Sequence, residues 1–402
     1  MEKAKYKDRI SLLFKIESLN RKGKMKLSGR EELFYRLRII PLITFIMLCS
    51  FFILSGQVVV DNTEKPKNKA AGRIIQLEEV MRIRDDGKNF VIRNPQQISE
   101  LEDGSIIFFD YPYVIKVDKE GKFLFKIPGQ GQGPRESHHP NSYFIEGNRI
   151  RIYSWIPPKV LEYDLRGKFI KEFKTPLHGP FAFIGIVDDR IYGVRDEIRF
   201  SEAIHQEGII QTPYRLYEIS FDFKELRKVH DIMMEHYVKK ARWVRRAMFT
   251  AVAYKHFLFY VHSAEYSIER FNLRTERTEL IFSRKYIAPR SDEAQDYQDP
   301  YERFDPGFRP PPQHEFYIQR LQIFRNHLWV KTSTEKDGGQ KWQIDVFDLD
   351  GNYVDSFYLA FPGGNQNHWS QFTITNDSFI FVAEEEKETG LLSIGKYILK
   401  NY

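Results

Sequence analysis

Eleven histidines are the residues of this 402-residue chain best suited to bind a metal ion or to transfer protons. A catalytic zinc site needs three ligands that converge on one point. His138 and His139 are adjacent, so their side chains point in opposite directions in an extended chain, and His256 and His262 flank a single apolar run. The sequence contains no H-E-x-x-H, G-x-S-x-G or P-loop motif. We therefore predict no catalytic residue, no metal ligand and no cofactor.

Ionisable side chains that converged at the mouth of a channel would instead indicate an enzyme. Such an enzyme would be a lyase or hydrolase acting on an anionic saccharide or a lactone, with or without a metal ion. The residues that would have to converge are His139, His178, Glu315, Arg320 and His368.

Basic side chains gather in a few long polar segments, above all in residues 231–247, where their spacing allows a short helix. A basic surface with aromatic residues suits an anionic polymer or a protein partner. The alternatives are a solvated charged loop, or neutralisation by acids such as Asp292 and Glu293 in a neighbouring segment. The candidate binding-face residues are Arg135, His138, His139, Arg195, Arg199, Lys239, Lys240, Arg242, Trp243, Arg245, Arg246, Arg303 and His368.

The elements that would position these residues form a repeat that begins near residue 74. Residues 105–127 (SIIFFDYPYVIKVDKEGKFLFKI) align with residues 149–173 (RIRIYSWIPPKVLEYDLRGKFIKEF) as apolar strands separated by a Gly-Lys hairpin turn. The turns of successive units start at Asp118, Asp164, Asp222, Asn272 and Asp348. Four strands in a period of about 40–50 residues are typical of a β-propeller.

Six such units are present, and each begins with a further short strand. The sixth unit ends with its third strand at the C-terminus, so its fourth strand must come from elsewhere. Residues 73–84 (RIIQLEEVMRIR) precede the first unit and have a strand-like pattern. We predict that they pair with the C-terminal strand and close the ring, which removes unpaired strand edges.

The first two units resemble the bacterial six-bladed propellers of the NHL-like or TolB-like type. Their shared motifs are the D-G-x-I strand, the D-x-x-G-K hairpin and a Gly-rich loop, here residues 129–134 (GQGQGP), after which Arg135 and Ser137 depart from the usual Gly and Phe. The resemblance covers residues 74–402 and implies an all-β, six-bladed propeller with four-stranded blades. It implies little about function, because propellers host many activities.

The N-terminal region differs from this repeat in composition. The chain has a net charge of +6, but residues 1–38 alone carry +7, so nucleic-acid binding is not predicted for the remainder. Residues 39–60 form a signal or transmembrane segment behind this basic cytoplasmic leader, and residues 61–72 are a polar linker. Met25 is an alternative start, and the single cysteine, Cys49, excludes an intramolecular disulfide.

The longest connections all fall at one end of the predicted blades. Binding residues concentrate on loops held by a rigid scaffold, although neutral loop growth is the alternative. We therefore predict an exported, non-enzymatic scaffold in the periplasm or at the cell surface. It would bind a protein, peptide or glycan outside the cytoplasm through its insertion-rich face. If residues 39–60 are not cleaved, it would also be anchored in the inner membrane.

Overall fold

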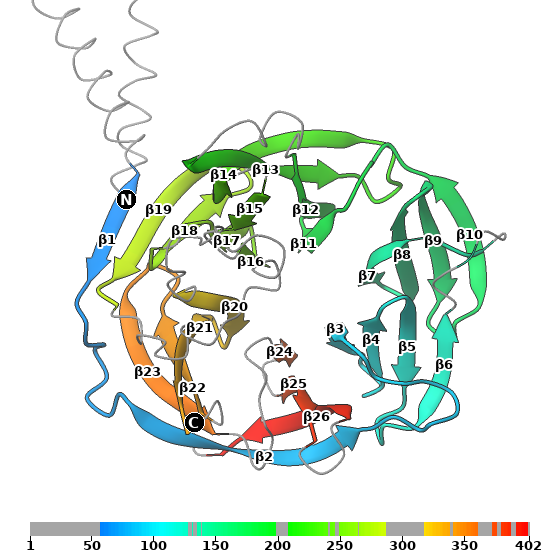
Figure 1. Ribbon diagram of the computed structural model, residues 1–402, viewed down its shortest axis with the longest axis horizontal. Coiled ribbons are helices and arrows are strands. Elements are labelled where there is room, and N and C mark those ends of the chain that lie inside the picture. The colour runs from blue at the N-terminus through cyan, green and yellow to red at the C-terminus, as the bar shows by residue number, and fades with distance from the viewer. Residues whose placement is uncertain are drawn as a thin grey trace, which may run out of the picture. The chain divides into compact units, whose positions relative to one another are not determined.

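Strands make up all the regular secondary structure that the computed structural model describes. In Figure 1 they form twisted sheets arranged around a central axis. No helix among the described residues is long and apolar enough to cross a membrane. The structure describes residues 57–127, 131, 135–137, 139–197, 208–239, 242–245, 249–263, 265–286, 317–337, 341–360, 372–375, 379–386 and 391–400.

Blades 1 and 2 are four-stranded antiparallel sheets whose strands follow one another from the ring centre outward. Short hairpins join their alternating apolar strands, as the repeat predicts. Blade 1 consists of β3 (Pro95–Glu100), β4 (Ile106–Asp110), β5 (Tyr113–Val117) and β6 (Phe123–Ile127). Blade 2 consists of β7 (Pro140–Glu146), β8 (Arg149–Trp155), β9 (Pro158–Asp164) and β10 (Phe169–Lys174).

Blades 3 and 4 are five-stranded, because each carries one strand beyond the usual four. Blade 3 consists of β11 (Ala182–Val187), β12 (Arg190–Asp196), β13 (Gly208–Ile219), β14 (Leu226–Lys239) and β15 (Arg242–Arg245). Blade 4 consists of β16 (Thr250–Tyr254), β17 (Phe257–Val261), β18 (Ser267–Asn272), β19 (Arg277–Arg284) and β1 (Val58–Asn62). Strand β1 lies parallel to β19 on the outer edge.

The last two blades are joined into one eight-stranded sheet by β2 (Arg73–Ile83). The first residues of β2 run parallel to β23, and Leu77–Ile83 then pair antiparallel with β26. Blade 5 consists of β20 (Ile318–Phe324), β21 (His327–Lys336), β22 (Lys341–Phe347) and β23 (Tyr353–Ala360). Blade 6 consists of β24 (Phe372–Thr375), β25 (Phe379–Glu385), β26 (Leu392–Leu399) and the second half of β2.

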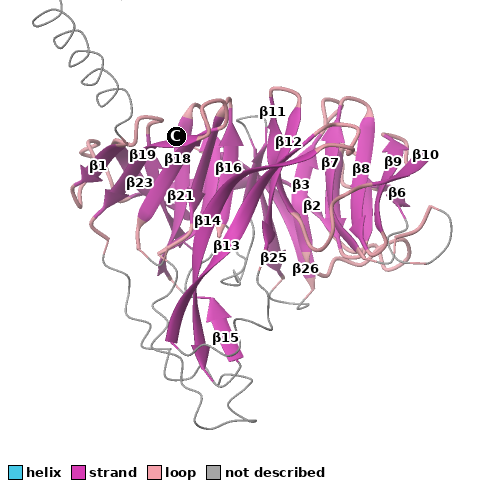
Figure 2. Ribbon diagram, turned by 90° about the horizontal axis from the view of Figure 1, so that it is seen from above, coloured by secondary structure: helices cyan, strands magenta, loops and turns pink. Residues whose placement is uncertain are grey.

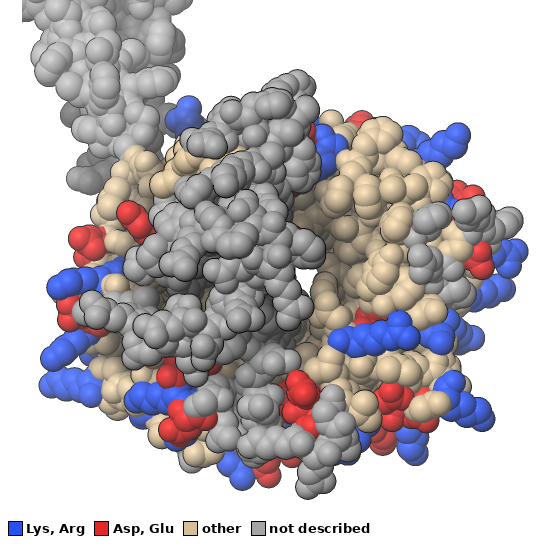
Figure 3. Space-filling model, viewed as in Figure 1, with Lys and Arg blue, Asp and Glu red and all other residues tan. Residues whose placement is uncertain are grey.

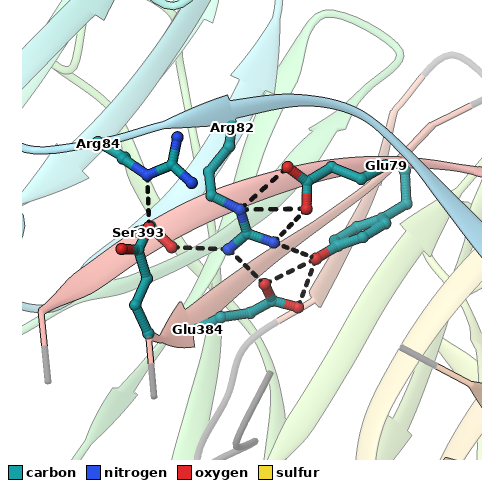
Figure 4. A network of polar contacts seen from close by, with 7 residues as sticks. Glu79, Arg82, Arg84, Glu384 and Ser393 are labelled. Atoms are coloured by element: carbon teal, nitrogen blue, oxygen red, sulfur yellow. Dashed lines mark hydrogen bonds and ion pairs between the residues drawn. The ribbon is translucent and has the colours of Figure 1, made fainter. Parts of the chain in front are cut away.

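A buried polar network accompanies this pairing of the N-terminal strand with blade 6 (Figure 4). The guanidinium of Arg82 on β2 lies 2.7 Å from the carboxylate of Glu384 on β25 and donates a 2.8 Å hydrogen bond to Ser393 on β26. The Tyr397 hydroxyl also donates to Glu384 at 2.7 Å. The strand that supplies the fourth position of blade 6 is therefore held by side chains as well as by its backbone ladder.

Residues 58–72 pair with the outer strands of the ring, whereas the sequence predicted the end of an apolar segment up to residue 60 and a polar linker from residue 61. Val58–Asn62 form β1, and the side-chain amide of Asn62 donates hydrogen bonds to the backbone carbonyls of Ser283 and Gly351, both at 2.9 Å. Further along, the Lys67 and Asn68 amides donate to carbonyls of β23. The polar composition of this stretch indicated a tether, but the outer strands β19 and β23 offer unpaired backbone groups that its amides satisfy.

Among the described residues, the core consists of six apolar clusters, each between two neighbouring blades. The aromatic residues that alternate along the strands pack there: Phe108 lies between blades 6 and 1, Tyr153 between blades 2 and 3, and Trp329 between blades 5 and 6. Because each blade buries both faces in this way, the ring is a single packed unit that presents its connections at two ends.

The turn aspartates explain the regularity of the repeat. Asp118, Asp164 and Asp348 each accept hydrogen bonds from two backbone amides of their own turn, which fixes the hairpin locally. Gly167, three residues after its aspartate, has φ of 78°, and a Cβ atom there would lie 2.8 Å from the Phe125 ring of blade 1. Glycine is required because the turn packs directly against the preceding blade.

Candidate functional site

The two ends of the ring differ in the length of their connections. At one end the first and second strands, and the third and fourth strands, are joined by short turns such as Gly147–Asn148 and Asp188–Asp189. The other end, which we call the insertion face, holds the remaining connections, including residues 128–139, 197–207, 285–317 and 361–371. Most residues of these long connections lie outside the described part of the chain.

Blade 3 extends beyond the ring at the insertion face. Pairing of β12 with β13 ends at Asp196 and Tyr214, whereas pairing of β13 with β14 continues for six more residue pairs to Gly208 and Val238. At about 3.3 Å per residue, this continuation is roughly 20 Å long. We call Gly208–Pro213, Met233–Lys239 and β15 the arm, and Figure 2 shows it projecting from the disc.

The arm corrects the expectation of a short helix in residues 231–247. Strand β14 continues to Lys239 and returns as β15, with Lys239 opposite Arg242 and His236 opposite Arg245. The reason is visible in the burial of Ile232, Met234, His236 and Val238, which alternate with less buried neighbours. A period of two is that of a strand, and the run of basic residues at the tip obscured it.

The opposite face of the arm is open to solvent. Ile209 is 56% exposed on β13 and Met233 is 38% exposed on β14. Gln211 is exposed between them, opposite Glu235. Because residues paired across two strands share one side of the sheet, these side chains form one surface of mixed apolar and polar character.

The predicted basic residues are only partly placed by the structure. Lys239, Arg242, Trp243 and Arg245 belong by their backbone to β14 and β15 of the arm. The others of this group, together with candidates from four further connections, fall outside the described residues: His138, Arg199, Lys240, Arg246, Arg303 and His368.

Arg195 lies at the base of the arm, where a carboxylate neutralises its charge and a hydroxyl and a carbonyl accept its other hydrogen bonds. Its Nε donates to Glu197 at 2.6 Å, and its Nη atoms donate to the Tyr217 hydroxyl and the His178 carbonyl at 3.0 Å. Burial favours the neutral acid, but hydrogen bonds from Tyr217 and Arg195 hold the pKa of Glu197 below its ordinary value. Arg195 therefore stiffens the junction of the arm and presents little uncompensated charge.

Arg135 and His139 lie on the insertion face beside blades 1 and 2. The Arg135 guanidinium lies 5.1 Å from the centre of the Phe169 ring. The His139 ring lies 5.4 Å from the Trp155 ring, and its Nδ1 atom is 3.4 Å from the Tyr111 hydroxyl. The structure thus brings His139 into an aromatic group, while Arg135 is held against the blade.

Tyr111 and Trp155, the aromatic residues of this group, are not among the candidates predicted from the sequence. Tyr111, which is 45% exposed, stands before a proline in blade 1, and at the same point of blade 2 the residue before the proline is Ile156, which follows Trp155 directly. The recurrence of an apolar residue followed by proline between the second and third strands is a signal that the alignment of the two repeats contained.

The residues named for an enzyme are dispersed. His139 lies at blade 2, His178 precedes blade 3, and Arg320 is on the innermost strand of blade 5, across the ring (Figure 1). Glu315 and His368 lie outside the described residues. Within the described part of the chain, no three His, Cys, Asp or Glu side chains are placed to share a metal ion.

The charges visible along the ring axis are mixed. Figure 3 shows Lys and Arg interspersed with Asp and Glu around the rim, with mostly uncharged residues towards the centre, where there is an opening. Among the described residues on view, neither sign forms a continuous patch. Surfaces of this kind do not select a polyanion by charge alone.

Comparison with known proteins agrees with this architecture. Residues 62–240, from the end of β1 to the arm, match the DUF5128 family, which is described as a 6-bladed beta-propeller. None of the curated proteins matches the chain. The match covers less than half of the chain, so it identifies the type of fold.

Two solved structures are similar over most of the chain. A protein from Bacteroides fragilis described as exported has a TM-score of 0.53 at 13% identity, covering 85% of this chain and 100% of its own. A member of the DUF4221 family from Bacteroides vulgatus has a TM-score of 0.51 at 10% identity, covering 82% of this chain and 99% of its own. At these identities the likeness concerns the fold alone.

Proposed function

We propose that the protein is an exported, non-enzymatic scaffold that binds a protein partner through the arm of blade 3. The observation that carries the proposal is the continuation of β13 and β14 for six residue pairs beyond β12. The ring does not need this continuation for closure, because β2 closes it elsewhere. A rigid extension with its own exposed surface is a means of contacting a partner.

The chemistry of the arm favours a protein over a polyanion. Exposed apolar side chains at Ile209 and Met233 stand next to the polar Gln211 and Glu235, a mixture typical of protein interfaces. The outer edge of β15 has no strand neighbour among the described residues, so its backbone groups are available to an added strand. Both features serve a protein or an extended peptide segment.

Export is the second part of the proposal, and it rests on the apolar residues 39–60 behind a basic leader. The similar fold of a protein described as exported is consistent with it. We also propose that the first two blades are related to the NHL-like propellers that their sequences resemble. Protease treatment of spheroplasts tests export directly: the ring should be digested from outside, and protection would contradict the proposal.

Site-specific photocrosslinking tests the role of the arm. We would place a benzoylphenylalanine at Gln211, on the exposed face, and identify adducts in intact cells. The double variant Ile209→Ser/Met233→Ser should abolish these adducts, because it removes the apolar part of the contact.

The double variant Leu124→Ser/Ile170→Ser is the matched control. Leu124 is 49% exposed and Ile170 is 37% exposed, on the outer strands of blades 1 and 2. It should leave the adducts at position 211 unchanged. Equal loss in both double variants, or adducts that persist after the arm is altered, would contradict a binding role for this face.

A further inference from the structure

One buried lysine differs from the other two that the structure describes. Lys116, Lys331 and Lys396 are each at most 8% exposed. The Lys116 ammonium donates to the Leu165 carbonyl at 3.0 Å, and that of Lys396 donates to Glu100 at 2.6 Å. The side chain of Lys331, on β21, makes no hydrogen bond or ion pair with any described residue, although the residue is only 2% exposed.

The immediate neighbour of Lys331 is an aromatic ring. Its Nζ atom lies 3.6 Å from the centre of the Trp342 ring, which is itself fully buried. A ring face attracts a cation but supplies no hydrogen-bond acceptor comparable to oxygen for the three ammonium donors. Burial lowers the pKa of Lys331 to about 8, with the charge of Glu335 opposing this shift and that of Arg320 adding to it.

A second cation lies opposite the first on the neighbouring strand. Arg320 on β20 pairs in register with Lys331, next to a β-bulge that follows Ile318. Its Nε atom is buried without a hydrogen-bond acceptor among the described residues, while the residue as a whole is only partly buried. Burial lowers the pKa of Arg320 as well. The guanidinium is therefore desolvated at Nε, while part of the Arg320 residue stays accessible.

Two neighbouring cations that lack a partner destabilise each other and the fold. Like charges repel, and a desolvated charge without hydrogen bonds is costly to bury. Two other buried cations near blade junctions avoid this cost: Arg82 pairs with Glu384, and Arg284 pairs with Asp345. Arg320 and Lys331 are thus an exception that a bound anion would resolve.

We propose that Arg320 and Lys331 bind a compact oxyanion, the carboxylate or phosphate group of a small molecule, at the inner edge of blade 5. The planar guanidinium offers parallel N–H donors to two oxygens of such a group, and the ammonium adds a point charge. Strand β20 is the innermost strand of its blade, which places Arg320 at the edge of blade 5 nearest the ring centre (Figure 1). The proposal is independent of the arm and of its partner.

Calorimetric titration of the full-length protein tests this site. Phosphate, sulfate and malonate would be titrated separately at constant ionic strength, with chloride as the reference anion. We expect one site per chain for at least one of the three, and the preferred anion distinguishes a phosphate from a carboxylate ligand. Lys331→Met and Arg320→Met should each weaken binding at least about thirtyfold.

The control is Lys396→Met, which removes a buried lysine that already has a carboxylate partner and should leave the anion affinity unchanged. A second readout does not need binding: in chloride buffer without phosphate, sulfate or malonate, Lys331→Met should preserve or raise Tm, because a methionine replaces an uncompensated buried charge. The proposal is overturned if none of the three anions binds more tightly than chloride, or if either methionine variant at positions 320 and 331 keeps the original affinity.

Discussion

Arg82 and Glu384 form an ion pair of 2.7 Å between β2, near the start of the ring, and β25, near its end. The Glu384 side chain is fully buried and that of Arg82 is 10% exposed. Glu79, Ser393 and Tyr397 also contact the Arg82 guanidinium (Figure 4). The closing strand is therefore fixed at one register by a network that extends over three strands.

Arg82→Met should lower the free energy of unfolding by about 3 kcal/mol, because it leaves the Glu384 carboxylate buried without its cation. The matched control is Arg84→Met, two residues further along the chain and just past the end of β2. Arg84 is 62% exposed in its ion pair with Glu386, so its loss should cost less than about 1 kcal/mol. Urea denaturation of both variants measures the difference, and equal midpoints would contradict a structural role for the network.

Gly167→Ala should destabilise the protein more than Gly147→Ala does. Both glycines have positive φ, 78° and 50°, so alanine at either position costs about 1 kcal/mol. Only at Gly167 does a new Cβ meet the Phe125 ring, at 2.8 Å, whereas nothing lies within 4 Å of a Cβ at Gly147. We expect a further loss of about 1–3 kcal/mol at Gly167, read from the shift in denaturation midpoint.

The repeat was readable from sequence because its decisive contacts are local. Asp118 and Asp164 accept hydrogen bonds within their own turns, so the motif recurs wherever a blade needs that turn. The sixth unit has only three strands of its own, so residues 73–84 were predicted to supply the fourth. Strand β2 occupies that outer position beside β26. The pairing of residues 58–72 could not be predicted, because their partners on β19 and β23 lie more than 200 residues further along the chain.

The candidate sites were less readable because they depend on register. Ile232, Met234 and His236 are buried with the two-residue period of a strand, but the basic residues that follow them made this period hard to recognise in the sequence. Arg320 is paired with Lys331 through the register shift at the bulge after Ile318, and no local sequence pattern predicts this bulge. Charged residues also look alike in sequence, whether they are compensated, as Arg195 is by Glu197, or lack a partner.

His262 should titrate above the ordinary histidine pKa of 6.5, and His230 below it. Burial opposes charge on both rings. The His262 ring nevertheless places Nε2 2.8 Å from Glu269 and Nδ1 2.9 Å from the Met233 carbonyl, so both nitrogens face acceptors and the doubly protonated ring is favoured. Nuclear magnetic resonance titration of the two rings gives the order directly, and a His262 pKa below that of His230 would refute the assignment.

The stability effect of His262 has a definite sign. A pKa that is higher in the folded state stabilises the protein below the pKa of the unfolded state, and this contribution disappears as the pH rises through the folded-state pKa. His262→Gln should therefore destabilise the protein more at pH 5.5 than at pH 8. Equal losses of unfolding free energy at the two pH values would indicate that Glu269 does not interact with the charged ring.

Asp345→Asn should be the most destabilising of these substitutions. The Asp345 carboxylate is fully buried between blades 4 and 5, where it pairs with Arg284 at 2.6 Å and accepts hydrogen bonds from Tyr266 and Tyr353. Loss of its charge leaves a buried guanidinium unpaired, at a cost of about 3–5 kcal/mol. Asp350→Asn is the control, because that side chain is 86% exposed and should change stability by less than about 1 kcal/mol. In a double-mutant cycle with Arg284→Met, the coupling energy should exceed about 2 kcal/mol, and additive losses would show that the two charges act separately.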